Sequence, residues 1–436
     1  MIAPSPPSPP GSRGRNPLRL FRNPAFARLF SAEATSVSGS TIGQVALTWL
    51  VLVETNSAID IALLGVVGVT AAAAFSLVAG TIVDRQERRR LMILADLVRA
   101  GALAGLLIDY VAFGFHLGVV LACSFLLGAF TTLFFPAERA FLPSVVPPED
   151  LSDANGLALT SGSILTFAAT GIAGVLIGTV RLSGSIAVNV ATFLVSAALI
   201  FSLRSVTASS KAALPAAPAE SRTFLQDTAE GLRYLGASAQ RGLLWLTVSA
   251  GTANFFVIMV LQFLVLYSTR TLAGGPTLFG LLLGAFSLGF APGALMVGRF
   301  RAERFVGRVW ILGTGAAGFA LVGLVVLPTA PAAFLFLLGL GAIFGFTNTA
   351  WLTAVQRIVP SSMQGRYFGI DQLGSIAIIP AGQLVGGLLI AGHGVLWTFG
   401  VAAVGYVIAS IVFGTPRSLW RLTTPDADAG HPRTGP

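Results

Sequence analysis

The chain has 436 residues, of which 54% are hydrophobic and only 10% are charged, and its mean hydropathy is +0.82. A soluble domain carries about 25% charged residues, so this composition excludes one and indicates a polytopic membrane protein. The net charge of +9 does not indicate a nucleic-acid partner, because the basic residues lie in loops without an accompanying aromatic platform. The single cysteine, Cys123, excludes a disulfide within the chain.

A polar segment precedes the apolar part of the chain. Residues 1–16 are rich in proline, serine and glycine, which predicts disorder, and they lack the apolar core of a signal peptide. Residues 17–30 alternate arginines with leucines and phenylalanines. This alternation predicts a basic segment that rests on the inner leaflet of the membrane.

Twelve apolar runs follow, and each has roughly the 20 residues that a membrane-spanning helix needs. They predict an all-α polytopic membrane protein. The predicted spans cover residues 31–53, 58–83, 91–113, 116–135, 155–180, 184–203, 242–268, 278–298, 309–328, 331–357, 367–391 and 394–414.

The basic residues predict the orientation of these spans. Of the 27 lysines and arginines, 24 lie in segments on the same side as both termini, which an even number of spans places together. Arg181 and Arg270 lie on the other side, and Arg99 lies inside a span. Because basic loops are retained in the cytoplasm, we expect both termini to be cytoplasmic and the protein to lie in the plasma or inner membrane.

The longest loop separates the spans into two sets of six. Its first part is rich in alanine, serine and proline and predicts a flexible linker, whereas residues 225–235 have a leucine face and predict an interfacial helix. We therefore expect a tail and interfacial segment 1–30, a bundle 31–203, a linker 204–241, a second bundle 242–414 and a cytoplasmic tail 415–436.

Short repeats relate the two sets of spans. Leu127-Gly128-Ala129 recurs as Leu340-Gly341-Ala342, and Gly80 maps onto Gly293 at the same offset of 213 residues. These repeats predict two related six-helix halves.

A short basic loop joins the second and third spans, with the sequence Gly80-Thr81-Ile82-Val83-Asp84-Arg85-Gln86-Glu87-Arg88-Arg89-Arg90. The pattern Gly-x-x-x-Asp-Arg-x-x-Arg-Arg resembles motif A of the major facilitator superfamily. The continuation Leu94-Ala95-Asp96-Leu97-Val98-Arg99-Ala100 resembles the drug and siderophore exporter branch, which includes enterobactin exporters and macrolide efflux proteins. Glu87 departs from motif A, which prefers glycine there. The fifth span has Gly171-Ile172 where antiporters have Gly-Pro.

The resemblance implies a major facilitator fold in which motif A is a conformational latch. Gly80 would let the second helix approach the eleventh, and Asp84 would face the positive N-terminus of that helix. Arg85, Arg88 and Arg89 would join acids on neighbouring helices and hold the cytoplasmic side closed.

Polar residues inside the spans are candidates for the substrate cavity. Glu33, Ser36, Ser40, Gln44 and Thr48 share one face of the first span, although helix packing also explains serine and threonine there. The resemblance implies that the first, fourth, seventh and tenth helices line the cavity. The cavity candidates are Ser40, Gln44, Asn254, Gln262, Asn348 and Trp351.

Acids within spans are expensive to bury, so each needs a role. Asp96 and Arg99 are three residues apart on one helix, which predicts a structural ion pair. Glu33 and Asp371 lie near the cytoplasmic ends of the first and eleventh spans and are the candidates for binding a coupling proton.

The sequence contains no metal-ligand cluster, catalytic triad or phosphate-binding loop, so we expect neither an enzyme nor a cofactor or metal. We expect a monomeric secondary transporter in the lipid bilayer, whose partners are a small-molecule substrate and protons or another coupling ion. Proton-coupled efflux of an amphipathic molecule by alternating access is the favoured function. A nutrient importer and a lysophospholipid or lipid flippase are the alternatives.

Overall fold

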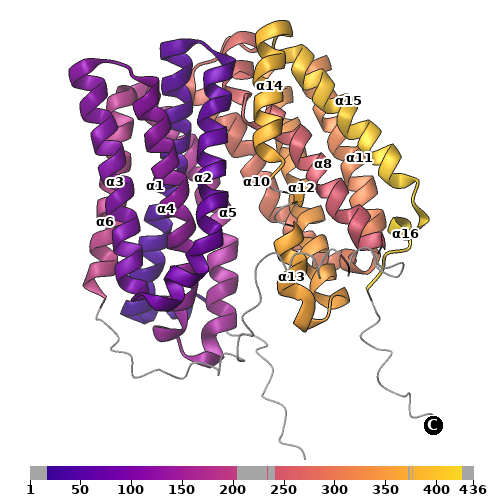
Figure 1. Cartoon of the computed structure of the whole chain (residues 1–436), viewed down its shortest axis with the longest axis horizontal. Coiled ribbons are helices and arrows are strands. Elements are labelled where there is room, and N and C mark those ends of the chain that lie inside the picture. The colour runs from indigo at the N-terminus through magenta and orange to yellow at the C-terminus, as the bar shows by residue number, and fades with distance from the viewer. Residues whose placement is uncertain (1–16, 204–232, 234–240, 372–373, 376, 425–436) are drawn as a thin grey trace, which may run out of the picture.

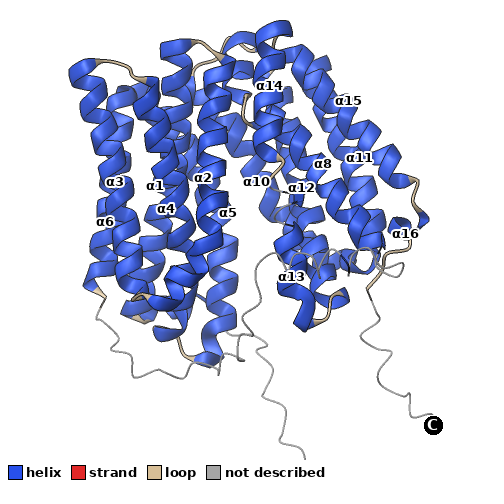
Figure 2. Cartoon of the chain, viewed as in Figure 1, coloured by secondary structure: helices blue, strands red, loops and turns tan. Residues whose placement is uncertain are grey.

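The computed structural model describes residues 17–203, 233, 241–371, 374–375 and 377–424. Throughout these residues the chain is helical and contains no strand (Figure 2). The predicted disordered residues 1–16 lie outside the described residues, as does the predicted interfacial helix 225–235 apart from Arg233.

Two helical bundles lie side by side (Figure 1). The N-bundle consists of α1 (Pro24–Thr55), α2 (Ala58–Arg85), α3 (Arg88–Phe113), α4 (Leu117–Phe141), α5 (Leu151–Thr179) and α6 (Arg181–Ser202). The C-bundle consists of α8 (Arg241–Leu261), α10 (Pro276–Phe300), α11 (Val306–Val326), α12 (Ala330–Ile358), α13 (Ser361–Asp371), α14 (Ile379–His393) and α15 (Val395–Gly414).

Ten described helical segments are long and apolar enough to cross a membrane. Two shorter apolar helices, Ile164–Thr179 and Ile379–His393, fall within the fifth and eleventh predicted spans. Large hydrophobic side chains such as Phe113, Leu295 and Phe319 are exposed around the bundles, as expected for helices that face lipid. The all-α polytopic fold predicted from the sequence is therefore confirmed.

Repeated glycines pack corresponding helix pairs in the two bundles. A Cβ atom at Gly128 of α4 would lie 2.3 Å from the carbonyl oxygen of Gly68 in α2. A Cβ atom at the corresponding Gly341 of α12 would lie 1.9 Å from the carbonyl oxygen of Phe286 in α10. Only a residue without a side chain allows such a close approach of two backbones.

The fourth helix is longer than predicted. It continues through Pro136 and ends at Phe141, whereas the sequence predicted a span that ended at residue 135. Proline removes a backbone donor and usually ends a helix, but membrane helices tolerate it where their neighbours satisfy the freed groups. The extension brings Glu138 and Arg139 into the bundle.

The eleventh predicted span is interrupted. Helix α13 ends at Asp371, and α14 begins at Ile379 with Pro380 in its first turn. Between them, the Ser375 carbonyl accepts a 2.7 Å hydrogen bond from the Asn254 amide of α8. Such breaks are tolerated at membrane depth when neighbouring side chains bind the freed backbone groups.

Both predicted tails pack in part against the protein. Leu20 and Phe26 are buried, and Arg19 forms an ion pair with Asp150, so residues 17–30 contact the N-bundle rather than only the membrane surface. At the other terminus, Leu419 of α16 (Arg417–Trp420) is fully buried against the C-bundle.

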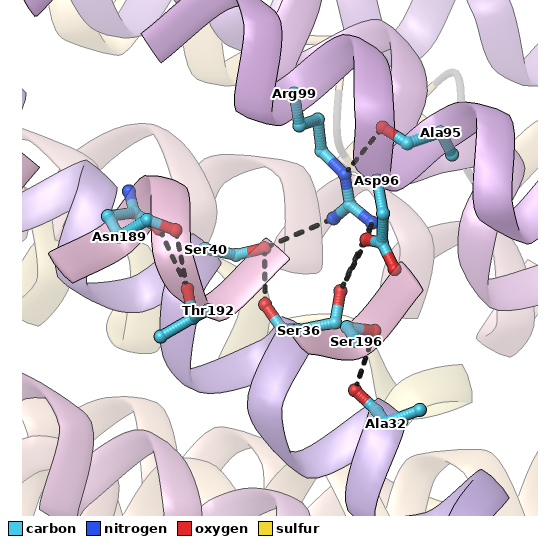
Figure 3. Close-up of polar contacts among 9 residues, drawn as sticks. All are labelled: Ala32, Ser36, Ser40, Ala95, Asp96, Arg99, Asn189, Thr192 and Ser196. Atoms are coloured by element: carbon cyan, nitrogen blue, oxygen red, sulfur yellow. Dashed lines mark hydrogen bonds and ion pairs between the residues drawn. The ribbon is translucent and has the colours of Figure 1, made fainter. Parts of the chain in front are cut away.

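A buried ion pair lies inside the N-bundle (Figure 3). The guanidinium of Arg99 binds the carboxylate of Asp96, and both side chains are 0% exposed. Arg99 also donates to the hydroxyl oxygens of Ser36 at 3.1 Å and Ser40 at 3.3 Å, and to the carbonyl oxygen of Ala95 at 3.2 Å. Nearly all of its donors are therefore satisfied without water.

Two aromatic rings complete this cluster. The guanidinium carbon of Arg99 lies 4.8 Å from the ring centre of Phe134 and 4.5 Å from that of Phe193, within the range of cation–π attraction. These partners come from α4 and α6, and the serines come from α1. Arg99 on α3 thus connects four helices of the N-bundle.

The two bundles contact each other toward one end. We call the end with the turn Gln86–Glu87 the arginine-rich end, and the end with Asn56 and Gly394 the opposite end. Toward the opposite end, a Cβ atom at Gly280 of α10 would lie 2.4 Å from the Thr170 carbonyl oxygen of α5. Helices α2 and α14 also lie side by side there (Figure 1).

Hydrogen bonds strengthen this contact. Arg270 donates to the backbone carbonyl of Asn56 at 2.7 Å and to its side-chain oxygen at 2.9 Å. Asn56 caps the C-terminus of α1, where a cation is favoured by the helix dipole. Gln262 donates to the Ile61 carbonyl at 3.0 Å. The opposite end is therefore closed by direct contacts between the bundles.

We predict that the replacement Gly341→Ala destabilises the C-bundle, because the added methyl group must push α10 and α12 apart. The expected loss is about 1–3 kcal/mol, the usual cost of overpacking. Gly339→Ala on the same helix is the control, since a Cβ atom there meets nothing within 4 Å and alanine favours helices. Thermal unfolding of the purified variants in detergent measures the difference, and equal stability of the two variants would contradict this packing.

We also predict that Asp96→Leu lowers the free energy of unfolding by about 3–5 kcal/mol, because it leaves the buried Arg99 charge without its carboxylate. Asp109→Leu, on the same helix, removes one member of an exposed pair with His116 and should cost no more than about 1 kcal/mol. The double variant Asp96→Leu/Arg99→Leu should recover most of the loss. Equal losses for Asp96→Leu and Asp109→Leu would show that the pair does not stabilise the bundle.

Candidate functional site

Three pockets lie among the helices of the two bundles. We call them the N-pocket, the C-pocket and the acidic pocket, and their volumes are about 280, 220 and 470 Å³. Each is lined by a mixture of polar and apolar side chains, as sites that bind small molecules combine both. Together they contain all but one of the cavity and coupling residues predicted from the sequence.

The C-pocket brings together four of the predicted residues: Asn254, Asn348, Trp351 and Asp371. Asp371 is 8% exposed and accepts a 3.1 Å hydrogen bond from Ser375 at the break before α14. Asn348 donates to the carbonyl of Phe344 in its own helix at 3.1 Å. The Asp371 carboxylate therefore shares a pocket of the C-bundle with the side chains of Asn254 and Asn348.

Two hydrogen-bond donors of the C-pocket have no acceptor among the described residues. They are the indole nitrogen of Trp351 and the hydroxyl of Tyr406, and both atoms are buried. Leaving such donors unpaired costs free energy, so the pocket is suited to a polar ligand or water that accepts from them. Tyr406 was not predicted, because a tyrosine in the last apolar span gives no signal by itself.

The N-pocket contains the predicted residues Ser40 and Gln44. Ser40 also accepts from Arg99, so the buried ion pair fixes one wall of this pocket. Asn189 of α6 is fully buried, and its side-chain nitrogen has no partner among the described residues. Gln383 reaches the N-pocket from α14 of the other bundle.

Gln262 is placed elsewhere. It follows Leu261, the last residue of α8. Its side-chain amide donates to the backbone carbonyl of Ile61 in α2, at the opposite end. Its side-chain oxygen accepts from Gln383 at 3.3 Å. Gln262 lines none of the three pockets and instead contributes to the contact between the bundles.

The acidic pocket contains Glu33 of α1 together with Glu138 and Arg139 of α4. Helices α5 and α10 complete it with Asn155 and Phe286, among other residues. Glu138 was missed in the sequence because the fourth span was ended before Pro136. Continuing the helix would have found it, since Thr131, Phe135 and Glu138 are spaced to share one face.

In the described part of the chain, no motif A side chain forms a hydrogen bond or ion pair with the other bundle. A Cβ atom at Gly80 would meet nothing within 4 Å, and the side chain of Asp84 lies outside the described part of the chain. Arg88 donates to the carbonyl of Ala140, and Arg89 donates to that of Ile200, so both bind the free C-terminal carbonyls of neighbouring helices. Their predicted role as a latch stays a prediction for a state closed at the arginine-rich end.

Comparison with known proteins gives the family. Residues 15–431 match the family described as transmembrane secretion effector. The chain is 25% identical to the enterobactin exporter EntS of Salmonella choleraesuis (strain SC-B67), over 94% of this chain and 97% of that protein. It is 27% identical to macrolide efflux protein A of Streptococcus pyogenes over 63% of this chain.

Some relatives are matched only in part. The chain spans 66% of macrolide efflux protein A and 43% of another relative, which is less than two thirds of either.

Among solved structures, a bacterial homologue of the lysosomal transporter Spinster superposes with a TM-score of 0.71 over 96% of this chain and 100% of that one, at 14% identity. That likeness supports the fold. The relatives are transporters rather than enzymes, as the sequence predicted.

The family match over nearly the whole chain, the two bundles and the resemblance of the Gly80–Arg90 loop to motif A agree with one another. The chain belongs to the transmembrane secretion effector family of the major facilitator superfamily and is a multi-pass membrane protein.

Proposed function

We propose that this transporter exports a small amphipathic molecule by alternating access, and that protons drive the export. The observation that carries the proposal is that the acidic pocket is lined by α1, α4 and α5 of one bundle and by α10 of the other. The described close contacts of α5 with α10 and of α2 with α14 lie toward the opposite end. Export is supported by relatives named for efflux of a macrolide and of enterobactin.

The expected orientation gives this shape a direction. The charge bias supports a cytoplasmic arginine-rich end, and in that orientation the structure would be a state that loads from the cytoplasm. Release outside would require the opposite end to separate and the arginine-rich end to close. Motif A is proposed to hold that second state, in which Gly80 and Asp84 would face the N-terminus of α13.

The pockets support an amphipathic substrate. Each combines aromatic or aliphatic walls with a few polar groups, for example Phe344 with Asn254 in the C-pocket and Phe135 with Asn155 in the acidic pocket. Apolar walls favour a hydrophobic body, and the polar groups orient it.

Proton coupling is proposed for Glu33 and Asp371. Each is a carboxylate in a pocket, and neither forms an ion pair with a described residue. A carboxylate without a cation partner can change its protonation when its access to water changes. Asp96 is unsuited to this task because Arg99 holds its charge.

Efflux from intact cells, screened over a chemically diverse compound panel, tests this proposal. Expression of the chain should lower the accumulation of at least one amphipathic compound, and a protonophore should abolish the difference. The double variant Glu33→Gln/Asp371→Asn should lose uphill efflux while keeping passive equilibration down the substrate gradient.

Glu149→Gln is the matched control, because Glu149 is exposed at the arginine-rich end and lies outside the three pockets. It should transport like the wild type. Uphill efflux by the double variant with an unchanged response to the protonophore would rule out both carboxylates as the coupling site. Accumulation that rises on expression would indicate import instead.

A further inference from the structure

Glu138 is a buried carboxylate that no described residue binds. Its residue surface is 5% exposed, and it accepts no hydrogen bond and forms no ion pair with any residue in the described part of the chain. Glu138 also lines the acidic pocket. A carboxylate without a partner in the protein, on the wall of a pocket, is suited to bind a partner that arrives from outside the chain.

The second carboxylate of the acidic pocket faces the same space. Glu33 of α1 lines the pocket together with Glu138 of α4. Glu33 likewise makes no hydrogen bond or ion pair with a described residue. Two carboxylates that share a pocket disfavour an anion and attract a cation.

Arg139 only partly offsets this charge. It lines the same pocket, but it is exposed and forms no ion pair with Glu33 or Glu138. Solvent therefore screens its charge more than that of the buried Glu138. With both glutamates ionised, the three groups sum to one negative charge, so a ligand with a single positive charge would neutralise the pocket.

The rest of the pocket is suited to an apolar ligand body. Phe135 of α4 and Phe286 and Phe290 of α10 line it, together with Val37 and Leu142. Its volume of about 470 Å³ is within the range of small-molecule sites. Aromatic faces also attract cations, so they favour the same charge as the glutamates do.

We propose that the acidic pocket binds a monocationic amphipathic ligand, with its positive charge between Glu33 and Glu138 and its apolar part against Phe135, Phe286 and Phe290. This rests on the proposed function in that the ligand would be the transported molecule. The pocket includes residues of both bundles, so a ligand there contacts α1, α4 and α5 on one side and α10 on the other.

Tetraphenylphosphonium is a suitable probe, because it is a permanent cation with an aromatic body. Tetraphenylborate has nearly the same shape and the opposite charge. Equilibrium binding of labelled tetraphenylphosphonium to the purified full-length protein in nanodiscs should be saturable, and tetraphenylborate should not compete for the site. Absence of saturable binding, or equal competition by tetraphenylborate, would overturn the proposal.

Variants locate the binding charge. Glu138→Gln and Glu33→Gln should each weaken tetraphenylphosphonium binding by about tenfold or more, because each removes a charged partner in a mostly buried pocket. Glu138→Asp should bind more tightly than Glu138→Gln, since it restores the charge. Glu149→Gln, which removes an exposed charge from the same end of the protein, should bind like the wild type.

Wild-type affinity in both Glu138→Gln and Glu33→Gln would contradict the site, even if efflux is observed. Binding that depends on Glu138 without any detectable efflux would uphold the site and reject export as the function. Size-exclusion profiles and thermal unfolding of each variant separate a loss of binding from a loss of folding. The comparison of the two probes on the wild type does not depend on any variant.

Discussion

The buried ion pair between Asp96 and Arg99 is the interaction on which the N-bundle depends. A charge inside a membrane protein is tolerated when it is paired and hydrogen-bonded internally. Here the two charges bind each other and Arg99 also donates to Ser36, while the second carboxylate oxygen of Asp96 has no partner among the described residues. The partners of Arg99 come from α1, α3, α4 and α6, so the four helices cannot shift independently without breaking a contact of Arg99 (Figure 3). The N-bundle can therefore move as a unit.

The same pair also positions a binding surface. Ser40 is bound to Arg99 and lines the N-pocket, and Phe193 both packs on Arg99 and lines that pocket. No described ion pair of the C-bundle is fully buried, since Arg357 is exposed in its pair with Glu303. Close glycine contacts pack α10 against α12 there, as they pack α2 against α4 in the N-bundle.

Helix irregularities occur in two spans of the C-bundle. The seventh span has a turn at Gln262, whose side chain binds the Ile61 carbonyl of α2. The eleventh has a turn at 377–378 before α14, and Asn254 of α8 binds the nearby Ser375 carbonyl. Interrupted membrane helices supply polar backbone and side chains at the depth of the substrate. Here they place Asp371 in the C-pocket and Gln383 beside the N-pocket.

The sequence predicted the features that follow from composition and spacing. Apolar length located the spans, motif A identified the superfamily, and a spacing of three residues paired Asp96 with Arg99. The sequence did not predict the interruption before Ile379, because its apolar residues are consistent with one continuous helix. Glu138 was missed because the predicted fourth span ended at residue 135. In the structure, α4 continues through Pro136 to Phe141. Which polar residues face a pocket depends on packing between bundles, and periodicity within one helix cannot give that.

The central claim is that the two bundles rock against each other, so that one end opens as the other closes. Distances between two spin labels, measured by pulsed electron–electron double resonance in a Cys123→Ser background, test this rocking motion most directly. One label pair would replace Glu149 and Arg299 at the arginine-rich end, and the other would replace Phe113 and Val326, which are exposed at the opposite end. The replacement Gly280→Trp provides the perturbation, because a Cβ atom there already lies 2.4 Å from the Thr170 carbonyl oxygen.

Rigid-body rocking predicts that Gly280→Trp lengthens the Phe113–Val326 distance and shortens the Glu149–Arg299 distance in the same molecules. A longer distance at the opposite end with no change at the arginine-rich end would contradict the account, because it would mean that the bundles separate locally without alternating access.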